Sequence, residues 1–152
     1  MNLKSYQALI EQTDASLSIY ANTASFLYQE LPTINWAGFY FLKDNTLHLG
    51  PFMGKPACTI ININNGVCGK CVRDQQTIVV KNVHEFDGHI ACDSASNSEI
   101  VLPLFLDHHL IGVLDIDSFE FDRFSTHDKE TLEELVSILM SEIKKATISI
   151  TL

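Results

Sequence analysis

The sequence has few positive charges. Its 152 residues include 10 Lys and Arg against 19 Asp and Glu, which gives a net charge of −9, and the basic residues form no cluster. Proteins bind duplex nucleic acid mainly by neutralising its phosphates with Lys and Arg. We therefore expect no nucleic-acid partner. The excess of carboxylates favours solubility, and it also suits a ligand that carries positive charge.

Long hydrophobic segments are lacking too. The longest apolar runs, Trp36–Leu42 and Ile100–Leu106, have seven residues each, whereas a membrane-spanning helix needs roughly 18 or more. Glu11 and Asp14 interrupt the pattern expected of a signal peptide. We therefore expect a cytoplasmic protein that does not bind membranes. In that reducing compartment its four cysteines should be catalytic, metal-binding or buried rather than permanent disulfides.

Internal repeats, low-complexity tracts and flexible linkers are absent from the sequence, so we expect a single domain over residues 1–152. The domain begins with a helical pattern. Apolar side chains recur at steps of three and four over Leu17–Leu31, and Pro32 ends that helix. Asp14 is a candidate cap for it, which would leave Leu3–Gln12 as a separate short helix.

The middle of the chain is rich in strand patterns. A turn dipeptide, Asp44-Asn45, predicts one hairpin, and Asp107-His108-His109 predicts a second. A short helix is expected from Gly66 to about Asp74. The expected strands, in chain order, are Ile34–Lys43, Thr46–Leu49, Ala57–Ile63, Thr77–Val80, Glu99–Leu106 and Leu110–Asp117.

The chain returns to helix at its C-terminus. Ser125 and Asp128 form a candidate capping box, and an apolar stripe follows at Leu132, Leu135, Val136, Leu139 and Ile143. Helices that enclose antiparallel hairpins in the sequence predict an α+β domain. We expect a mostly antiparallel sheet with the helices packed on one side.

Residues 81–97 form a long polar segment without periodicity, which is typical of a functional loop. Cys92 lies in it, three residues after His89 and next to Asp93. A nearby imidazolium or loop N–H groups would lower the pKa of its thiol and make it a nucleophile. The alternative is an inert, small hydrophobic residue under the loop. Spacing alone does not decide between the two.

Two more cysteines, Cys68 and Cys71, form a Cys-x-x-Cys pair. Cys68 is expected near the start of a helix, where the helix dipole favours a thiolate. The pair suggests either a redox motif or half of a zinc site completed by His84, His89, Cys58 or Cys92. A second tight ligand pair is missing, which argues against zinc.

Acidic residues end the last strand. Asp115 and Asp117 alternate, so both point to one face, and Glu99 begins the neighbouring strand. Buried carboxylates need a cation, a hydrogen-bonding ligand or a shared proton. The candidates are a metal with oxygen ligands, the ammonium group of an amino acid, or simply solvated strand ends.

Trp36 is the only tryptophan, and it lies in an apolar strand. Gly38 beside it allows close approach by a ligand or another strand. A lone tryptophan in such a strand is more often part of the core than of a pocket.

Six stretches of the sequence carry a more specific pattern. They are INWAGFY at 34–40, GPFMGK at 50–55, GVCG at 66–69, FDGHIACD at 86–93, SNSEIVLP at 96–103 and GVLDIDS at 112–118. Together they closely resemble the free methionine-(R)-sulfoxide reductases, which are stand-alone GAF domains, over nearly the whole chain. The resemblance implies a GAF-like fold, with the N- and C-terminal helices on one face of the sheet, and a homodimer.

The resemblance also implies roles for individual residues. Cys92 matches the nucleophile, Cys58 the main resolving cysteine and Cys68 a second one, whereas Cys71 has no counterpart that we associate with the family. The residues that match substrate-binding positions are Trp36, Tyr40, Glu99, Asp115 and Asp117. The implied reaction reduces free methionine (R)-sulfoxide through a sulfenic acid and a disulfide, with thioredoxin as reductant. It needs no cofactor or metal.

Two other function classes fit a GAF-like chain. One is a binding module for a small ligand such as a cyclic nucleotide. The other is a structural domain stabilised by zinc. Methionine formation from the free sulfoxide would exclude the first, and metal analysis would test the second.

Overall fold

The computed structural model describes residues 1–89, 92 and 94–149. Ile90, Ala91 and Asp93, which belong to the loop motif, lie outside the described residues. The elements follow one another as α1 (Leu3–Ile10), α2 (Ser16–Glu30), β1 (Ile34–Lys43), β2 (Thr46–Gly54), β3 (Ile60–Asn62), α3 (Gly66–Asp74), β4 (Ile78–Val80), the 3₁₀ turn η1 (Val83–Glu85), β5 (Ser98–Leu106), β6 (His109–Ser118) and α4 (Thr126–Lys145).

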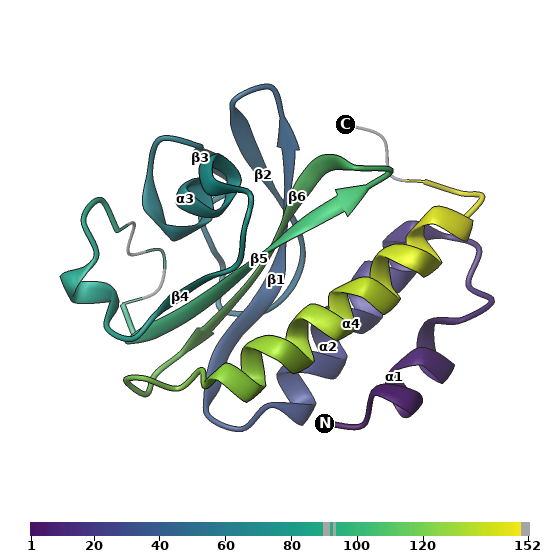
Figure 1. Ribbon diagram of the computed structural model, residues 1–152, viewed down its shortest axis with the longest axis horizontal. Coiled ribbons are helices and arrows are strands. Elements are labelled where there is room, and N and C mark those ends of the chain that lie inside the picture. Colours follow the sequence, from purple (N-terminus) through teal and green to yellow (C-terminus); the bar gives the residue numbers. More distant parts are fainter. Residues whose placement is uncertain (90–91, 93, 150–152) are drawn as a thin grey trace.

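The six strands form one sheet in the order β3-β2-β1-β6-β5-β4, and every neighbouring pair is antiparallel. Helices α1, α2 and α4 cover one face, and α3 lies on the other (Figure 1). The expected α+β fold, with the N- and C-terminal helices on one face, is confirmed. The expectation that all helices share one side is wrong for α3, because its apolar side chains pack on the opposite face.

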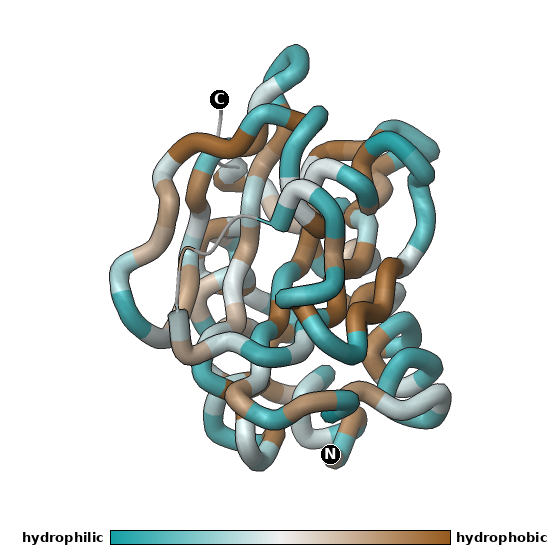
Figure 2. The backbone as a smooth tube through the Cα atoms, turned by 90° about the vertical axis from the view of Figure 1, so that its left-hand side faces the viewer, coloured by the Kyte–Doolittle hydropathy of each residue, from teal (hydrophilic) through white to brown (hydrophobic). Residues whose placement is uncertain are grey.

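Alternation along the strands separates two cores. On β1, Ala37, Phe39 and Phe41 face α2 and α4, whereas Trp36 and Tyr40 face α3. Because successive side chains of a strand point to opposite faces, each central strand contributes to both cores. Hydrophobic segments are accordingly concentrated in the interior, and hydrophilic ones at the loops (Figure 2).

The β5–β6 hairpin fixes the register of the acidic residues. Its turn consists of Asp107 and His108, whose φ angles of 48° and 66° are left-handed, so His109 belongs to the strand and not to the turn. Two-residue turns of this handedness match the twist of the flanking strands. The turn pairs Leu106 with His109, and a β-bulge between Leu104 and Phe105 then shifts the pairing by one residue. Beyond the bulge Glu99 lies opposite Asp117.

Gly38 is required by close packing of the sheet. A Cβ atom there would lie 2.3 Å from the Cβ of Phe52 and 2.7 Å from the ring of Trp36. The expectation of a close approach by another strand is therefore confirmed, since Phe52 belongs to β2.

Some element boundaries differ from the sequence expectation. β2 continues to Gly54, and β3 is shorter than the expected Ala57–Ile63 strand. Asp14 does not cap α2, whose N-cap is Ala15 without a side-chain hydrogen bond. Instead, the Asp14 carbonyl accepts hydrogen bonds from the backbone of Thr147 and Ile148. Contacts with the C-terminal segment therefore fix the start of α2.

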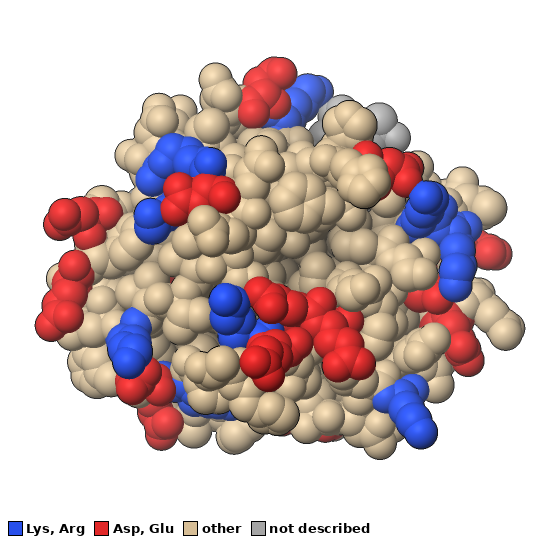
Figure 3. Space-filling view, viewed as in Figure 1, with Lys and Arg blue, Asp and Glu red and all other residues tan. Residues whose placement is uncertain are grey.

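The capping box of α4 is confirmed. The Ser125 hydroxyl accepts a hydrogen bond from the Asp128 backbone, and the Asp128 carboxylate accepts one from the Ser125 backbone. Arg123 also contacts this carboxylate at 3.0 Å. None of the described helices is long and apolar enough to cross a membrane. On the face seen in Figure 3, Lys and Arg side chains are scattered, and acidic side chains gather near the middle.

Candidate active site

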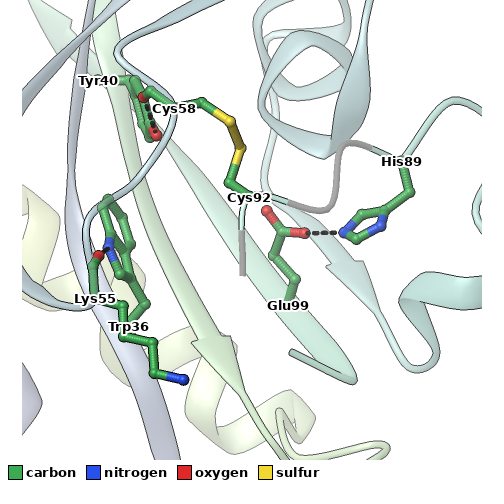
Figure 4. The surroundings of a disulfide bond; sticks show 7 residues. All are labelled: Trp36, Tyr40, Lys55, Cys58, His89, Cys92 and Glu99. Carbon is green, nitrogen blue, oxygen red and sulfur yellow. Dashed lines mark hydrogen bonds and ion pairs between the residues drawn. A yellow bond between two sulfur atoms is a disulfide. The ribbon is translucent and has the colours of Figure 1, made fainter. Parts of the chain in front are cut away.

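The site centres on a disulfide between Cys58 and Cys92. The two residues are 34 positions apart in the sequence, and their Cα atoms are 5.6 Å apart. Cys58 lies in the segment between β2 and β3, and Cys92 in the long loop before β5. The Tyr40 hydroxyl donates a hydrogen bond of 2.8 Å to the Cys58 carbonyl, which ties the Cys58 backbone to β1 (Figure 4).

A small cavity lies beside the disulfide. Its volume of about 40 Å³ gives room for a few water molecules rather than for an amino acid. The lining residues belong to β3, α3, β5, β6 and the loop before β5. The residues are Ile61, Gly66, Val67, Cys68, His89, Cys92, Ser96, Glu99, Asp115 and Asp117. The structure thus brings Cys92, Cys68 and the three acidic candidates together.

Strand register delivers the three carboxylates to one place. Glu99 pairs with Asp117 across β5 and β6, and Asp115 pairs with Val101, two residues further along. Glu99 and Asp115 are 6% and 7% exposed, and Asp117 is half-buried. The interpretation of these residues as solvated strand ends is therefore wrong for Glu99 and Asp115.

Burial changes the protonation of this cluster. Desolvation raises the pKa of Glu99 well above its usual range, and the nearby charges of Asp115 and Asp117 raise it further. Desolvation also raises the pKa of Asp115 to about 6, although hydrogen bonds with Glu99 and Cys68 act in the opposite direction. Desolvation and repulsion between like charges therefore favour a proton in this cluster, and Glu99 is the candidate acid.

One oxygen of the cluster remains unsatisfied. Asp115 Oδ1 is buried and has no hydrogen-bond partner among the described residues. Buried polar atoms are normally paired, so this oxygen is suited to a ligand that donates hydrogen bonds.

Cys68 and Cys71 are free thiols in different positions. Cys68 lines the cavity from the first turn of α3, whereas Cys71 is fully buried in the core below it. Desolvation raises the pKa of Cys68, and the charge of Asp115 adds to this effect. Burial likewise raises the pKa of Cys71 to about 12. The expected thiolate at Cys68 is wrong, because burial beside carboxylates outweighs the helix dipole.

His89 reaches the acidic cluster from the loop. Its Nε2 lies 3.8 Å from Glu99 Oε2, and its side chain is 16% exposed against 7% for Glu99 (Figure 4). Partial burial lowers the pKa of His89, as does the charge of His84. The expected imidazolium near Cys92 is therefore a neutral imidazole at neutral pH.

Trp36 and Tyr40 lie next to the site rather than in its cavity. Both are 2% exposed. The Trp36 ring stacks between Tyr40 and Phe52 at centroid distances of 5.8 and 5.3 Å, and its Nε1 donates to the Lys55 carbonyl. In this disulfide-bonded form the interpretation of Trp36 as a core residue is the better description.

Sequence reasoning missed Ser96, which lines the cavity and accepts a hydrogen bond from Asn35. It also missed the contact between His89 and Glu99, since only the folded loop brings them together. One group of the described residues has the types and spacing of metal ligands. Its side-chain atoms, from Cys68, Glu99 and Asp115, lie within 4.8 Å of one another. Hydrogen bonds with Glu99 and Cys68 lower the pKa of Asp115, whereas its Oδ1 has no partner among the described residues.

Comparison with known proteins places this architecture in a family. The GAF domain family matches residues 19–143. The free methionine-R-sulfoxide reductase of Escherichia coli is 52% identical over 136 residues, which cover 90% of this chain and 82% of that protein. The enzyme of the same name from Saccharomyces cerevisiae is 40% identical and covers 90% and 81%.

Solved structures agree with these relatives. The reduced form of fRMsr from Staphylococcus aureus superposes with a TM-score of 0.89 at 49% identity, covering 92% of this chain and 91% of that one. Free methionine-R-sulfoxide reductase from Neisseria meningitidis, in complex with its substrate, gives 0.90 at 38% identity, covering 95% and 87%. The chain therefore belongs to the free methionine-R-sulfoxide reductases, oxidoreductases built on a GAF domain.

Proposed function

We propose that this chain reduces free L-methionine (R)-S-oxide to L-methionine, with Cys92 as the nucleophile. One observation carries the proposal, which is that a Cys58–Cys92 disulfide borders a cavity lined by Glu99, Asp115 and Asp117. A redox-active thiol and a buried acid are the two groups that reduction of a sulfoxide requires. The names of the relatives and the substrate complex of the Neisseria enzyme support the same reaction.

The chemistry begins with the reduced protein. The Cys92 thiolate attacks the sulfoxide sulfur while Glu99 donates a proton to the oxygen. Glu99 suits this role because its raised pKa favours the protonated form. Methionine leaves and Cys92 becomes a sulfenic acid. A second thiol displaces water from it to form a disulfide.

Cys58 is the main resolving cysteine in this proposal, because it is the partner to which Cys92 is bonded. Cys68 is the alternate, since it lines the same cavity, although its raised pKa disfavours the attacking thiolate. Cys71 has no role in the reaction. It contributes a small apolar side chain to the core beneath the site.

Asp115 and Asp117 bind the α-ammonium group of the substrate. Asp115 Oδ1, which is buried and has no hydrogen-bond partner among the residues described, is suited to accept from that group. A methionine residue within a peptide lacks an ammonium group and would leave this oxygen unpaired at a cost in binding free energy. This explains selectivity for the free amino acid. Trp36 and Tyr40 are proposed to contact the methyl end.

In this proposal the disulfide-bonded form is the oxidised state after turnover, and its cavity of about 40 Å³ is smaller than the substrate. Reduction of the disulfide must then precede substrate binding. We propose thioredoxin as the reductant, a cytoplasmic setting that supplies it, and a homodimer as the assembly, all from the family resemblance.

The test is an assay with stereochemically resolved substrates. Purified protein and dithiothreitol should convert free methionine (R)-sulfoxide to methionine, and should leave the (S) form and the N-acetylated sulfoxide unchanged. Cys58→Ser should retain the first turnover and slow recycling by thioredoxin. Failure to form methionine from either stereoisomer would refute the proposed reaction.

A further inference from the structure

An acid and a base lie side by side in the lining of the cavity. His89 Nε2 is 3.8 Å from Glu99 Oε2, and both side chains line the same small cavity as Cys92. Figure 4 shows the Glu99 carboxyl group directed toward the space between His89 and Cys92. In the proposed reaction Glu99 is the proton donor and Cys92 the nucleophile, but no residue accepts the proton of the Cys92 thiol.

Main-chain contacts hold the imidazole in this place. The Gly66 N–H at the start of α3 donates to the Gly88 carbonyl at 3.0 Å, and the His89 N–H donates to the Phe86 carbonyl at 3.2 Å. Gly88 has a φ of +78°, a left-handed conformation that favours glycine. The loop is therefore tied to α3 immediately before His89, which positions the ring against β5.

The surroundings of the two groups shift their pKa values in opposite directions. Burial and the carboxylates of Asp115 and Asp117 raise the pKa of Glu99, whereas burial and His84 lower that of His89. These shifts favour the carboxylic acid form of Glu99 and the free-base form of His89. Neighbouring groups whose pKa values are moved apart in this way are typical acid and base pairs of active sites.

The titratable groups near this pair come from three other elements. Asp115 and Asp117 lie on β6, Cys68 on α3, and His84 on η1. The acidic neighbours oppose ionisation of a thiol, because two like charges repel each other. Cys92, once reduced, is therefore in surroundings where a base is needed to form the thiolate.

We infer that His89 is the base that accepts the proton of the Cys92 thiol and then returns a proton to Glu99. The inference rests on the proposed function and adds a residue that the family resemblance does not assign.

The proton transfers balance within one turnover. His89 takes the thiol proton, and the thiolate donates an electron pair to the sulfoxide sulfur. Glu99 then protonates the oxygen, which leaves the substrate sulfur and ends as the hydroxyl of the Cys92 sulfenic acid. The Cys92 sulfur is oxidised by two electrons and the substrate sulfur is reduced by two. An imidazolium and a carboxylate then remain adjacent, and transfer of one proton from His89 to Glu99 restores both.

The test is a single-turnover experiment with fully reduced protein, free methionine (R)-sulfoxide and no thioredoxin. For the unaltered protein the rate of methionine formation should rise with pH as His89 loses its proton and fall as Glu99 ionises. His89→Gln should lower the rate at pH 7 by about 100-fold or more. With substrate at saturation, so that protonation of Asp115 does not limit binding, this variant should also lose the rise at acidic pH.

Two further variants separate catalysis from folding. His89→Gly with added imidazole should recover part of the rate, which a merely structural role would not allow. His84→Gln, in the same loop but outside the cavity lining, should keep the plateau rate. Its acidic limb should move to higher pH, because loss of the His84 charge lets the pKa of His89 rise.

The outcomes distinguish this inference from the proposed function. If the unaltered protein forms no methionine, both the proposed function and the inference are refuted. If the unaltered protein is active and His89→Gln has the same rate and pH profile, only the base assignment is overturned, and Asp117 becomes the candidate. A slow His89→Gln with an unchanged profile and no imidazole rescue of His89→Gly also overturns it.

Discussion

The two faces of the sheet are built from the same strands but serve different purposes. The face covered by α1, α2 and α4 is apolar and encloses the larger core. The face under α3 combines a smaller apolar cluster with free thiols, a disulfide and buried carboxylates. Neighbouring residues such as Leu114 and Asp115 therefore belong to different environments. We expect the first face to determine stability and the second to determine chemistry, which the following variants test.

The largest expected effect is on the cavity face. Cys92→Ser should abolish methionine formation, including the first turnover, because the nucleophile itself is removed. Cys71→Ala is the matched control, since it removes a buried thiol of the same face outside the cavity. It should keep the first turnover. Quantifying methionine from one equivalent of reduced protein decides the matter, and an active Cys92→Ser would disprove the nucleophile assignment.

On the helical face, Leu135→Ala should lower the free energy of unfolding by about 2–5 kcal/mol, because it opens a cavity at a fully buried position of α4. The rate of the first turnover should not change in the folded fraction. Leu17→Ala, on the exposed side of α2, should change the unfolding free energy by less than about 0.5 kcal/mol. Chemical denaturation measures both. Equal losses in the two variants would contradict the division between the faces.

Asp115→Asn should show that the cavity face costs stability. The pKa of Asp115 is raised to about 6 in the folded protein, so its stabilising contribution is complete below about pH 4 and is lost as the pH rises through 6. The amide cannot ionise, and the variant should be more stable at pH 8 by on the order of 1–3 kcal/mol. Asp44→Asn, at an exposed turn, is the control. Urea denaturation at pH 4 and pH 8 measures the free energy of unfolding. If this quantity changes with pH equally in Asp115→Asn and in the unaltered protein, the reasoning is wrong.

The smallest expected effect concerns the start of α4. Ser125→Ala removes the N-cap hydrogen bond and should lower the free energy of unfolding by about 1 kcal/mol. Ser141→Ala, at an exposed position within the same helix, should be neutral or slightly stabilising because alanine favours helix. Thermal unfolding followed by circular dichroism separates them. Neither variant should alter the first turnover.

Much of the fold follows from local sequence patterns. The β1 and β6 strands and the capping box of α4 lie close to where periodicity and turn residues place them. The extension of β2 to Gly54 and the side of the sheet taken by α3 do not follow, because both depend on packing between distant segments. The start of α2 likewise depends on hydrogen bonds from the C-terminal segment.

The candidate site was less accessible to sequence reasoning than the fold. The sequence alone indicates the loop and the acidic strand end as candidates. The family resemblance assigns thiol chemistry to the first and substrate binding to the second. The protonation states were not visible, because they result from burial. Cys68 is a thiol where the helix start suggested a thiolate, and His89 is neutral where an imidazolium was expected. Both differences arise because desolvation is a property of the whole fold.

The turn between β5 and β6 helps to set the strand register at the other end of the hairpin. Asp107 and His108 lie far along the strands from Glu99, yet their two-residue turn, together with the β-bulge between Leu104 and Phe105, sets which residues face each other near Glu99. Insertion of one residue there would shift the register of one strand, which exchanges the faces of its side chains. The carboxylates of that strand would then point into the helical core. The geometry of the candidate site thus also depends on a turn at the opposite end of the hairpin.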